Sequence, residues 1–138
     1  MSAAPIRGHE AERSLCQPHL DTLVGGSSEV LGALISTVDG FEVAANVRAT
    51  TSVQKLAAMT SSLLALAEAM SHEGEVGNCI DVVIEAGEGM VLIMDVPNDR
   101  RRLLLTVLCN KVATLGSVLW AARNTRNEIG SDISARTS

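Results

Sequence analysis

The strongest charge feature of this 138-residue sequence is a run of three arginines, Arg100, Arg101 and Arg102, directly after Asp99. Such a run could contact an acidic surface on a partner protein. It could also supply an arginine to a phosphoryl-transfer transition state in another protein. It is equally typical of a solvated hairpin whose charges keep a strand end from pairing with other chains. The sequence leaves these three interpretations open.

The histidines and cysteines form no recognisable reactive or metal-binding pattern. His9, His19 and His72 share no ligand spacing with one another or with the cysteines, and a zinc site needs three or four convergent ligands. We therefore expect solvated surface histidines. Cys79 and Cys109 fall in predicted strands, where free cysteines behave as small core residues. No side chain is assigned a catalytic, cofactor-binding or metal-binding role.

The glycine-rich segments do not predict a nucleotide site either. Gly87-Glu88-Gly89 lacks the third glycine and the strand-to-helix context of a dinucleotide-binding loop, so we interpret it as a hairpin turn. The sequence also contains no Walker-type Gly-Lys-Ser/Thr loop. The protein is therefore not expected to bind GTP by that route.

The composition excludes several classes of function. Hydrophobic residues make up 46% of the chain and charged residues 20%, which is typical of one globular domain with a core. A net charge of −5 and a near absence of aromatic residues argue against nucleic-acid binding. No apolar run reaches the roughly 18 residues that span a membrane, and no signal peptide is recognised. We expect a cytoplasmic protein with reduced cysteines.

Apolar periodicity and turn residues predict the order helix, two strands, helix, three strands, helix. The predicted elements are a helix at 14–24 with Pro18 in its first turn, strands at 30–36 and 41–45, a helix at 53–72, strands at 79–85, 90–96 and 102–108, and a helix at 111–128. Asp39-Gly40 predicts a type I′ turn between the first two strands. One domain at 14–128 is expected between flexible tails at 1–13 and 129–138.

Two of the predicted strands, at 90–94 and 103–108, are apolar on both faces. An antiparallel strand with one wet face would alternate apolar and polar residues. Both faces of the sheet must therefore be covered. The sequence predicts an α/β (α+β) sandwich, with a five-stranded antiparallel sheet and helices on both sides.

The helix predicted at 53–72 carries no charge from Leu56 to Ala67. A surface helix normally keeps one charged face. Here the large residues form one stripe, predicted to be buried and ending at Met70, while small uncharged residues lie on the other side. Small residues let another surface approach closely. The predicted partner-binding face consists of Ala58, Ser61, Ser62, Ala65 and Ala69.

The single tryptophan, Trp120, lies one residue beyond Leu119, off the main apolar stripe of the last predicted helix. A tryptophan in this position can anchor the core, or it can be an exposed residue that a partner covers. Both interpretations stay open.

The segment from Val30 to Ala44, an apolar strand followed by Asp-Gly-Phe, resembles the opening of roadblock / dynein light-chain domains. The Ala/Leu/Ser-rich helix after it and the sequence Ala113-Thr114-Leu115-Gly116 resemble the same family, over about residues 15–123. The resemblance implies a profilin-like sandwich that works as a homodimer, with central helices packed together and third strands paired. It adds the strand at 79–85, with Cys79, Asp81 and Val83, to the dimer surface.

The resemblance also implies a function. Bacterial and archaeal relatives commonly serve small Ras-like GTPases as regulators or scaffolds, and other relatives organise motor or signalling complexes. We therefore expect a non-enzymatic homodimer that binds a small GTPase without a cofactor. The alternative is a structural adaptor that is indifferent to nucleotide. A small-molecule sensor is a third hypothesis, weakened by the shortage of aromatic and polar residues for a ligand pocket.

Overall fold

The computed structural model describes the backbone of residues 4–136 and the side chains of residues 10–136. Its elements are α1 (Ala4–Gly25), β1 (Val30–Thr37), β2 (Glu42–Asn46), α2 (Val53–Glu73), β3 (Asp81–Ala86), β4 (Gly89–Val96), β5 (Leu103–Asn110) and α3 (Leu115–Ala135). The predicted order of elements is confirmed. The outermost parts of the predicted tails, 1–3 and 137–138, and the side chain of His9 lie outside the described residues.

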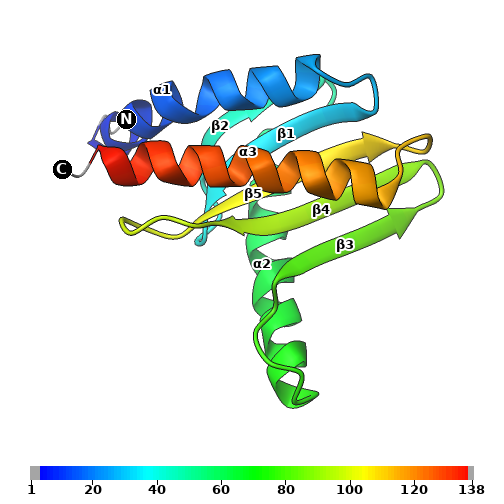
Figure 1. The fold of residues 1–138 in the computed structure, drawn as a ribbon. Coiled ribbons are helices and arrows are strands. Elements are labelled where there is room, and N and C mark those ends of the chain that lie inside the picture. The colour runs from blue at the N-terminus through cyan, green and yellow to red at the C-terminus, as the bar shows by residue number, and fades with distance from the viewer. Residues whose placement is uncertain (1–3, 137–138) are drawn as a thin grey trace.

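The five strands form one antiparallel sheet in the order β2-β1-β5-β4-β3 (Figure 1). The central strands β1 and β5 pair from Gly32 opposite Leu108 to Thr37 opposite Leu103. β4 pairs with β5 on one side and with β3 on the other. The predicted sheet is confirmed, and β2 and β3 are its two edge strands.

Helices cover both faces of the sheet, as predicted. α1 and α3 lie side by side on one face, and α2 lies alone on the opposite face (Figure 1). In β5, Leu103 and Leu105 belong to the main core beneath α1 and α3, while Leu104 between them faces the α2 side by strand alternation. All three leucines are fully buried, which explains why the strand is apolar on both faces.

Among the helices from Ala4 to Ala135, none combines the length and the apolar character that a membrane span requires.

The turn between β1 and β2 differs from the predicted type I′ turn, which needs positive φ at both central residues. Glu75 is the one described residue other than glycine with a positive φ, so Asp39 does not have one. Instead the Gly40 amide donates to the Thr37 carbonyl at 3.0 Å, and Gly40 has a φ of 97°. The loop is therefore longer than predicted, and its closing left-handed glycine brings the chain back into β2.

The first helix begins at Ala4, well before the predicted start at Ser14, and Pro18 lies inside it rather than in its first turn. A proline in a helix interior removes one backbone hydrogen bond. Here Cys16 and Leu20, on either side of Pro18, are fully buried against the core. Tertiary packing therefore holds the helix together across the proline.

The last helix begins at Leu115 rather than 111 and continues to Ala135 rather than ending at 128. Ile129 and Ile133, which were placed in the predicted tail, are buried in the core. Gly130 between them lies against the loop after β4, where an added Cβ would be 1.9 Å from the Pro97 carbonyl oxygen. The glycine thus allows a close contact instead of ending the helix.

The close contact at Gly130 predicts a stability effect. Gly130→Ala places a methyl group onto the Pro97 backbone, so we expect a loss of about 1–3 kcal/mol in the free energy of unfolding. Gly116→Ala, in the same helix with no atom within 4 Å of the added Cβ, is the matched control and should leave stability unchanged or slightly raised. Urea unfolding followed by circular dichroism measures both. Equal stability of the two variants would contradict the packing described.

Candidate protein-interaction site

The central helix α2 touches its own sheet along a narrow contact. Of its residues, Ala57, Thr60 and Leu64 are buried. Thr60 Oγ1 lies 3.0 Å from Thr106 Oγ1 of β5, a hydroxyl pair buried between helix and sheet. The N-terminus of α2 is capped by the Ser52 side chain, which accepts from the Lys55 amide at 3.4 Å. Most of the helix surface is left facing away from the domain.

The predicted partner face of α2 is exposed at four of its five positions. These are Ala58, Ser62, Ala65 and Ala69. Ser61 is half-buried, because its hydroxyl donates to the Val38 carbonyl in the β1–β2 turn. The turn packs closely there, and an added Cβ on Gly40 would lie 3.4 Å from the Ala58 Cα. Ser61 therefore has an intramolecular partner at the border of this face.

Three large apolar side chains extend the exposed face beyond the prediction. Met59, Leu66 and Met70 are 61%, 59% and 67% exposed. The predicted burial of Met70 is wrong, because the C-terminal end of α2 runs beyond the sheet (Figure 1). The sequence did contain a pattern that predicts this exposed apolar surface. The apolar residues 59, 63, 66 and 70 are spaced by four, three and four, which forms a second apolar stripe along the helix.

Two hollows lie on the α2 side of the molecule. The first is a shallow groove on the helix, lined by Ala58, Met59, Ser62, Leu63 and Leu66. The second, of about 350 Å³, lies between α2 and strands β3 and β4, lined by Leu56, Met59, Thr60, Leu63, Ile84, Val91 and Ile93. Both are almost entirely apolar. Apolar surface left open to water in this way marks a protein-interaction site.

The edge strand β3 has an open side. It pairs with β4 from Asp81 opposite Met94 to Ala86 opposite Gly89, and no other described strand pairs with it. Its outer edge presents backbone N–H and C=O groups that can pair with another chain. Val83 in this strand is also exposed.

The other edge strand, β2, is partly covered by α1. The Arg13 side chain donates to the Val43 carbonyl at 3.0 Å, and the Gln17 side chain donates to the Ala45 carbonyl at 2.9 Å. Carbonyls that already accept hydrogen bonds are less available for strand addition. Of the two edges, β3 is the one open to a partner strand.

Two of the predicted edge residues differ from expectation. Cys79 lies before β3 and is half-buried, so its prediction as a core strand residue is wrong; it belongs to the segment that returns from the end of α2. Asp81 begins the strand, but its carboxylate accepts from Arg123 at 3.2 Å and from Arg126 at 3.4 Å, both on α3. Asp81 can therefore offer its backbone, but not its side chain, to a partner along this edge.

Arg102 of the arginine run is tied into the domain. Its guanidinium donates to Asp95 of β4 at 2.8 Å and to Glu68 of α2 at 2.6 Å. The hydrogen bonds that it donates to these two carboxylates raise the pKa of Arg102 above its ordinary value. The cluster links α2 to the sheet near the point where the helix leaves it.

The other two arginines have different surroundings. Arg101 forms an ion pair with Glu12 of α1. Arg100 is exposed, and among the described residues its guanidinium has no ion pair. Of the three arginines, Arg100 is the one whose charge is left for an external partner.

The cysteines are shielded to different degrees. Cys109 is buried in β5, as predicted, and Cys16 is buried in α1. Burial raises the pKa of Cys16 to about 12 and the pKa of Cys109 to about 11. Burial and the nearby Glu68 also raise the pKa of Cys79, which is only half-buried. None of the three thiols has the lowered pKa of a reactive nucleophile.

His19 is not the solvated surface histidine that the sequence predicted. Its Nε2 lies 2.7 Å from an Asp132 carboxylate oxygen, and its Nδ1 lies 3.6 Å from a Glu128 oxygen. The packing of α1 beside α3 brings together residues whose separation in sequence gave no signal. His72 is exposed, as predicted, with Nε2 2.9 Å from Asn78 Oδ1. Within the described residues, no group of three or more His, Cys, Asp or Glu side chains could hold a metal ion.

Comparison of the sequence with known protein families gives a match to one family. The sequence profile of the Roadblock/LC7 domain matches residues 19–108, which is more than half of the chain. The chain belongs to the Roadblock/LC7 family. The resemblance noted in the sequence is confirmed. The match covers the last part of α1, strands β1 to β4, helix α2 and β5 up to residue 108, while α3 lies beyond it.

Solved structures share the fold at low sequence identity. A Roadblock/LC7 domain from Streptomyces avermitilis has a TM-score of 0.75 at 17% identity, covering 85% of this chain and 96% of that chain. MglB from Myxococcus xanthus has a TM-score of 0.72 at 11% identity, covering 92% and 90%. Profilin IB from Acanthamoeba castellanii has a TM-score of 0.56 at 15% identity, covering 89% and 99%, which confirms the profilin-like fold. Comparison with curated protein sequences gives no significant match.

The raised thiol pKa values predict how the cysteines react. Iodoacetamide attacks the thiolate, so at pH 8.5 the native protein should be alkylated at Cys79 first, with Cys16 and Cys109 protected. Burial holds the proton on Cys16 up to about pH 12 in the folded state, whereas the unfolded chain loses it near pH 9. The contribution of Cys16 to the free energy of unfolding is therefore fully present below about pH 9, and it should be lost between about pH 9 and pH 12. Mass spectrometry of alkylated peptides and urea unfolding across this range test both statements. Early alkylation of Cys16 would contradict its burial.

Proposed function

We propose that this Roadblock domain is a non-enzymatic, homodimeric regulator or scaffold of a small Ras-like GTPase in the cytoplasm. The observation that carries the proposal is the apolar, unpartnered face of α2 beside the open edge of β3. The family resemblance implies the same pair of surfaces for self-association and a GTPase as partner. Another solved structure of the same fold, MglB with a tetrameric arrangement, has a TM-score of 0.73 at 16% identity, covering 88% of this chain and 92% of that chain.

In the proposed dimer, a two-fold axis pairs β3 with its own copy and packs the two α2 helices together. A two-fold axis places the same patch on both subunits, and it makes a strand antiparallel to its copy. Ala65 and Ala69 allow the helix backbones to approach, while Met59, Leu66 and Met70 lose their contact with water. Full burial of such a side chain contributes about 1.5–3 kcal/mol.

Regulation of the GTPase would follow from surface recognition. The joined sheets and flanking helices of a dimer form a broad surface, and a higher affinity for one nucleotide state would shift the switch conformations of the GTPase. Arg102 is already held by Glu68 and Asp95, which argues against its donation to a transition state. Arg100 remains available to contact an acidic patch.

A charge on the α2 face should break the proposed dimer. Ala65→Arg would bury an unpaired cation between the helices, so we expect the dissociation constant to rise by about 100-fold or more. Ala65→Ser, which keeps a small uncharged residue, is the matched control and should remain dimeric. Sedimentation equilibrium measures both, and circular dichroism checks that both fold. An unchanged oligomer size for Ala65→Arg would rule out this interface.

The GTPase proposal is tested by capture from native lysate with the tagged protein, once in excess GDP and once in a non-hydrolysable GTP analogue. We expect a small GTPase to be retained in only one of the two nucleotides. Ala65→Arg serves as a control for the need for a dimer. The same partners in both nucleotides, with no GTPase among them, would contradict the regulator and favour the structural adaptor.

A further inference from the structure

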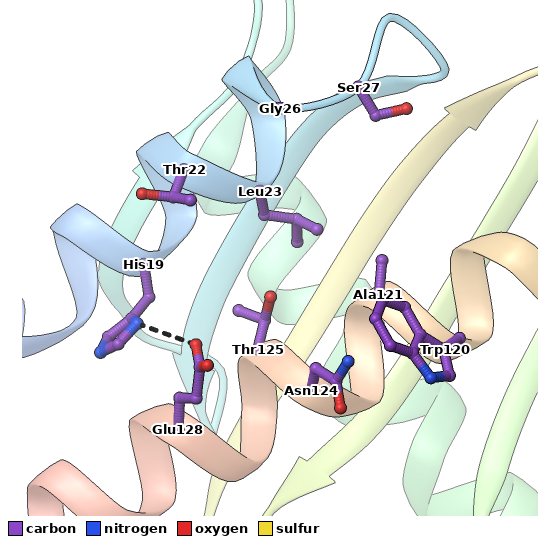
Figure 2. Close-up of a pocket in the computed structure, with 10 residues that line it drawn as sticks. All are labelled: His19, Thr22, Leu23, Gly26, Ser27, Trp120, Ala121, Asn124, Thr125 and Glu128. Carbon is purple, nitrogen blue, oxygen red and sulfur yellow. Dashed lines mark ion pairs between the residues drawn. The ribbon is translucent and has the colours of Figure 1, made fainter.

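A groove of about 350 Å³ lies between α1 and α3, on the face of the sheet opposite α2 (Figure 2). Leu23 of α1 and Thr125 of α3, both buried, face each other across its middle. Trp120 lies at one end, and His19 and Glu128 lie together at the other (Figure 2). The proposed dimer would cover the α2 side and leave this groove open.

Trp120 gives the groove an apolar end that its own domain does not cover. The side chain is 70% exposed, so Trp120 is not the core anchor that was one of the two interpretations of the sequence. An exposed tryptophan carries a large apolar surface whose burial on a partner contributes strongly to binding. Ala121 and Leu23 extend the apolar surface from Trp120 into the groove.

The opposite end of the groove is acidic. Glu128 lines this end and its side chain is largely exposed, while Asp132, one turn further along α3 and outside the groove lining, is about half exposed. His19 is the one ion-pair partner of both carboxylates among the described residues. A single imidazole can neutralise at most one of the two charges. The arginines of α3, Arg123 and Arg126, cannot compensate here, because they are turned to Asp81 on β3. This end therefore favours a cation.

The distance between the apolar and acidic ends of the groove defines the spacing that a bound segment must have. Trp120 and Glu128 are two helical turns apart on α3, which corresponds to about 12 Å. A cation and an apolar side chain separated by that distance lie about eight positions apart on a helix, or about four apart on an extended segment. Both end residues belong to α3, beyond the residues 19–108 matched by the family profile.

From these observations we propose that the groove between α1 and α3 is a second protein-docking site. Its occupant is a segment of another protein that carries a large apolar side chain and a Lys or Arg about 12 Å apart. The apolar group packs on Trp120, Ala121 and Leu23, and the cation pairs with Glu128. This site lies on the opposite face of the sheet from α2, so its occupation does not compete with the proposed contact between two α2 helices.

The test uses a tryptophan-free phage library of random 16-residue peptides, selected on the full-length protein and then synthesised. We expect the selected peptides to carry the cation and the apolar residue at the stated spacing. Trp120 is the one tryptophan of the chain, so a blue shift in its fluorescence on titration reports burial in the groove. Trp120→Ala should weaken binding about 10-fold or more. Glu128→Gln should weaken it several-fold and reduce its salt dependence.

Asn127→Ala, an exposed position on α3 outside the groove, is the matched control and should bind like the wild type. Circular dichroism and thermal unfolding confirm that each variant is folded. Three results would overturn the proposal: no peptide whose binding depends on Trp120, selected peptides that lack a cation, or equal binding by all variants. A change in the oligomer size of Trp120→Ala without peptide would overturn it as well, by showing that a second copy fills the groove.

Discussion

A sheet that is apolar on both faces must be covered on both faces, and this chain has three helices with which to do it. α1 and α3 share one face, so α2 alone must cover the other (Figure 1). One helix is too narrow for five strands, and α2 leaves the sheet before it ends. The exposed methionines and leucine of α2, the hollow beside β3 and β4, and the exposed side chains of β3 all follow from this imbalance. In the proposed dimer, a second copy of the same surface would cover these residues.

Two clusters of charged side chains hold helix α2 and the edge strand β3 in place. Arg102 ties α2 to β4 and β5 through Glu68 and Asp95. Asp81 is held from the other face by Arg123 and Arg126, which fixes the first residue of the open edge strand. Exposed ion pairs contribute little to global stability. Their effect here is to orient the helix and the strand before a partner arrives, and preorganisation lowers the cost of association.

Much of the fold could be predicted because it depends on local periodicity. The order of elements, the antiparallel sheet, and helices on both faces follow from apolar runs and short connections. The ends of α1 and α3 could not be predicted, since they depend on distant contacts. Pro18 and Gly130 are helix breakers in isolation, but burial of their neighbours keeps both helices continuous. The turn type depended on whether Asp39 adopts a positive φ, which the residue pair alone does not determine.

The candidate site was predictable in kind but less so in detail. The small residues of α2 drew attention to a side of the helix that the structure leaves exposed, but the second apolar stripe that includes Met59 and Leu66 was overlooked. Ser61 was predicted to lie on the partner-binding face, but its hydroxyl donates to the β1–β2 turn. Nothing in the sequence indicated this contact, because it joins segments that are distant in the chain. The groove beside Trp120 had no sequence signal, since α1 and α3 supply its two sides from opposite ends of the chain.

The most direct test of the central claim is hydrogen–deuterium exchange of the full-length protein over a range of concentrations. If the α2 face and the β3 edge join two copies, the amides of β3, Asp81–Ala86, should become about 10-fold or more slower to exchange as dimers form. The amides of β2, Glu42–Asn46, at the other edge, should exchange equally at all concentrations. Exchange in β3 that does not depend on concentration, in a range where sedimentation shows the oligomer forming, would contradict the account.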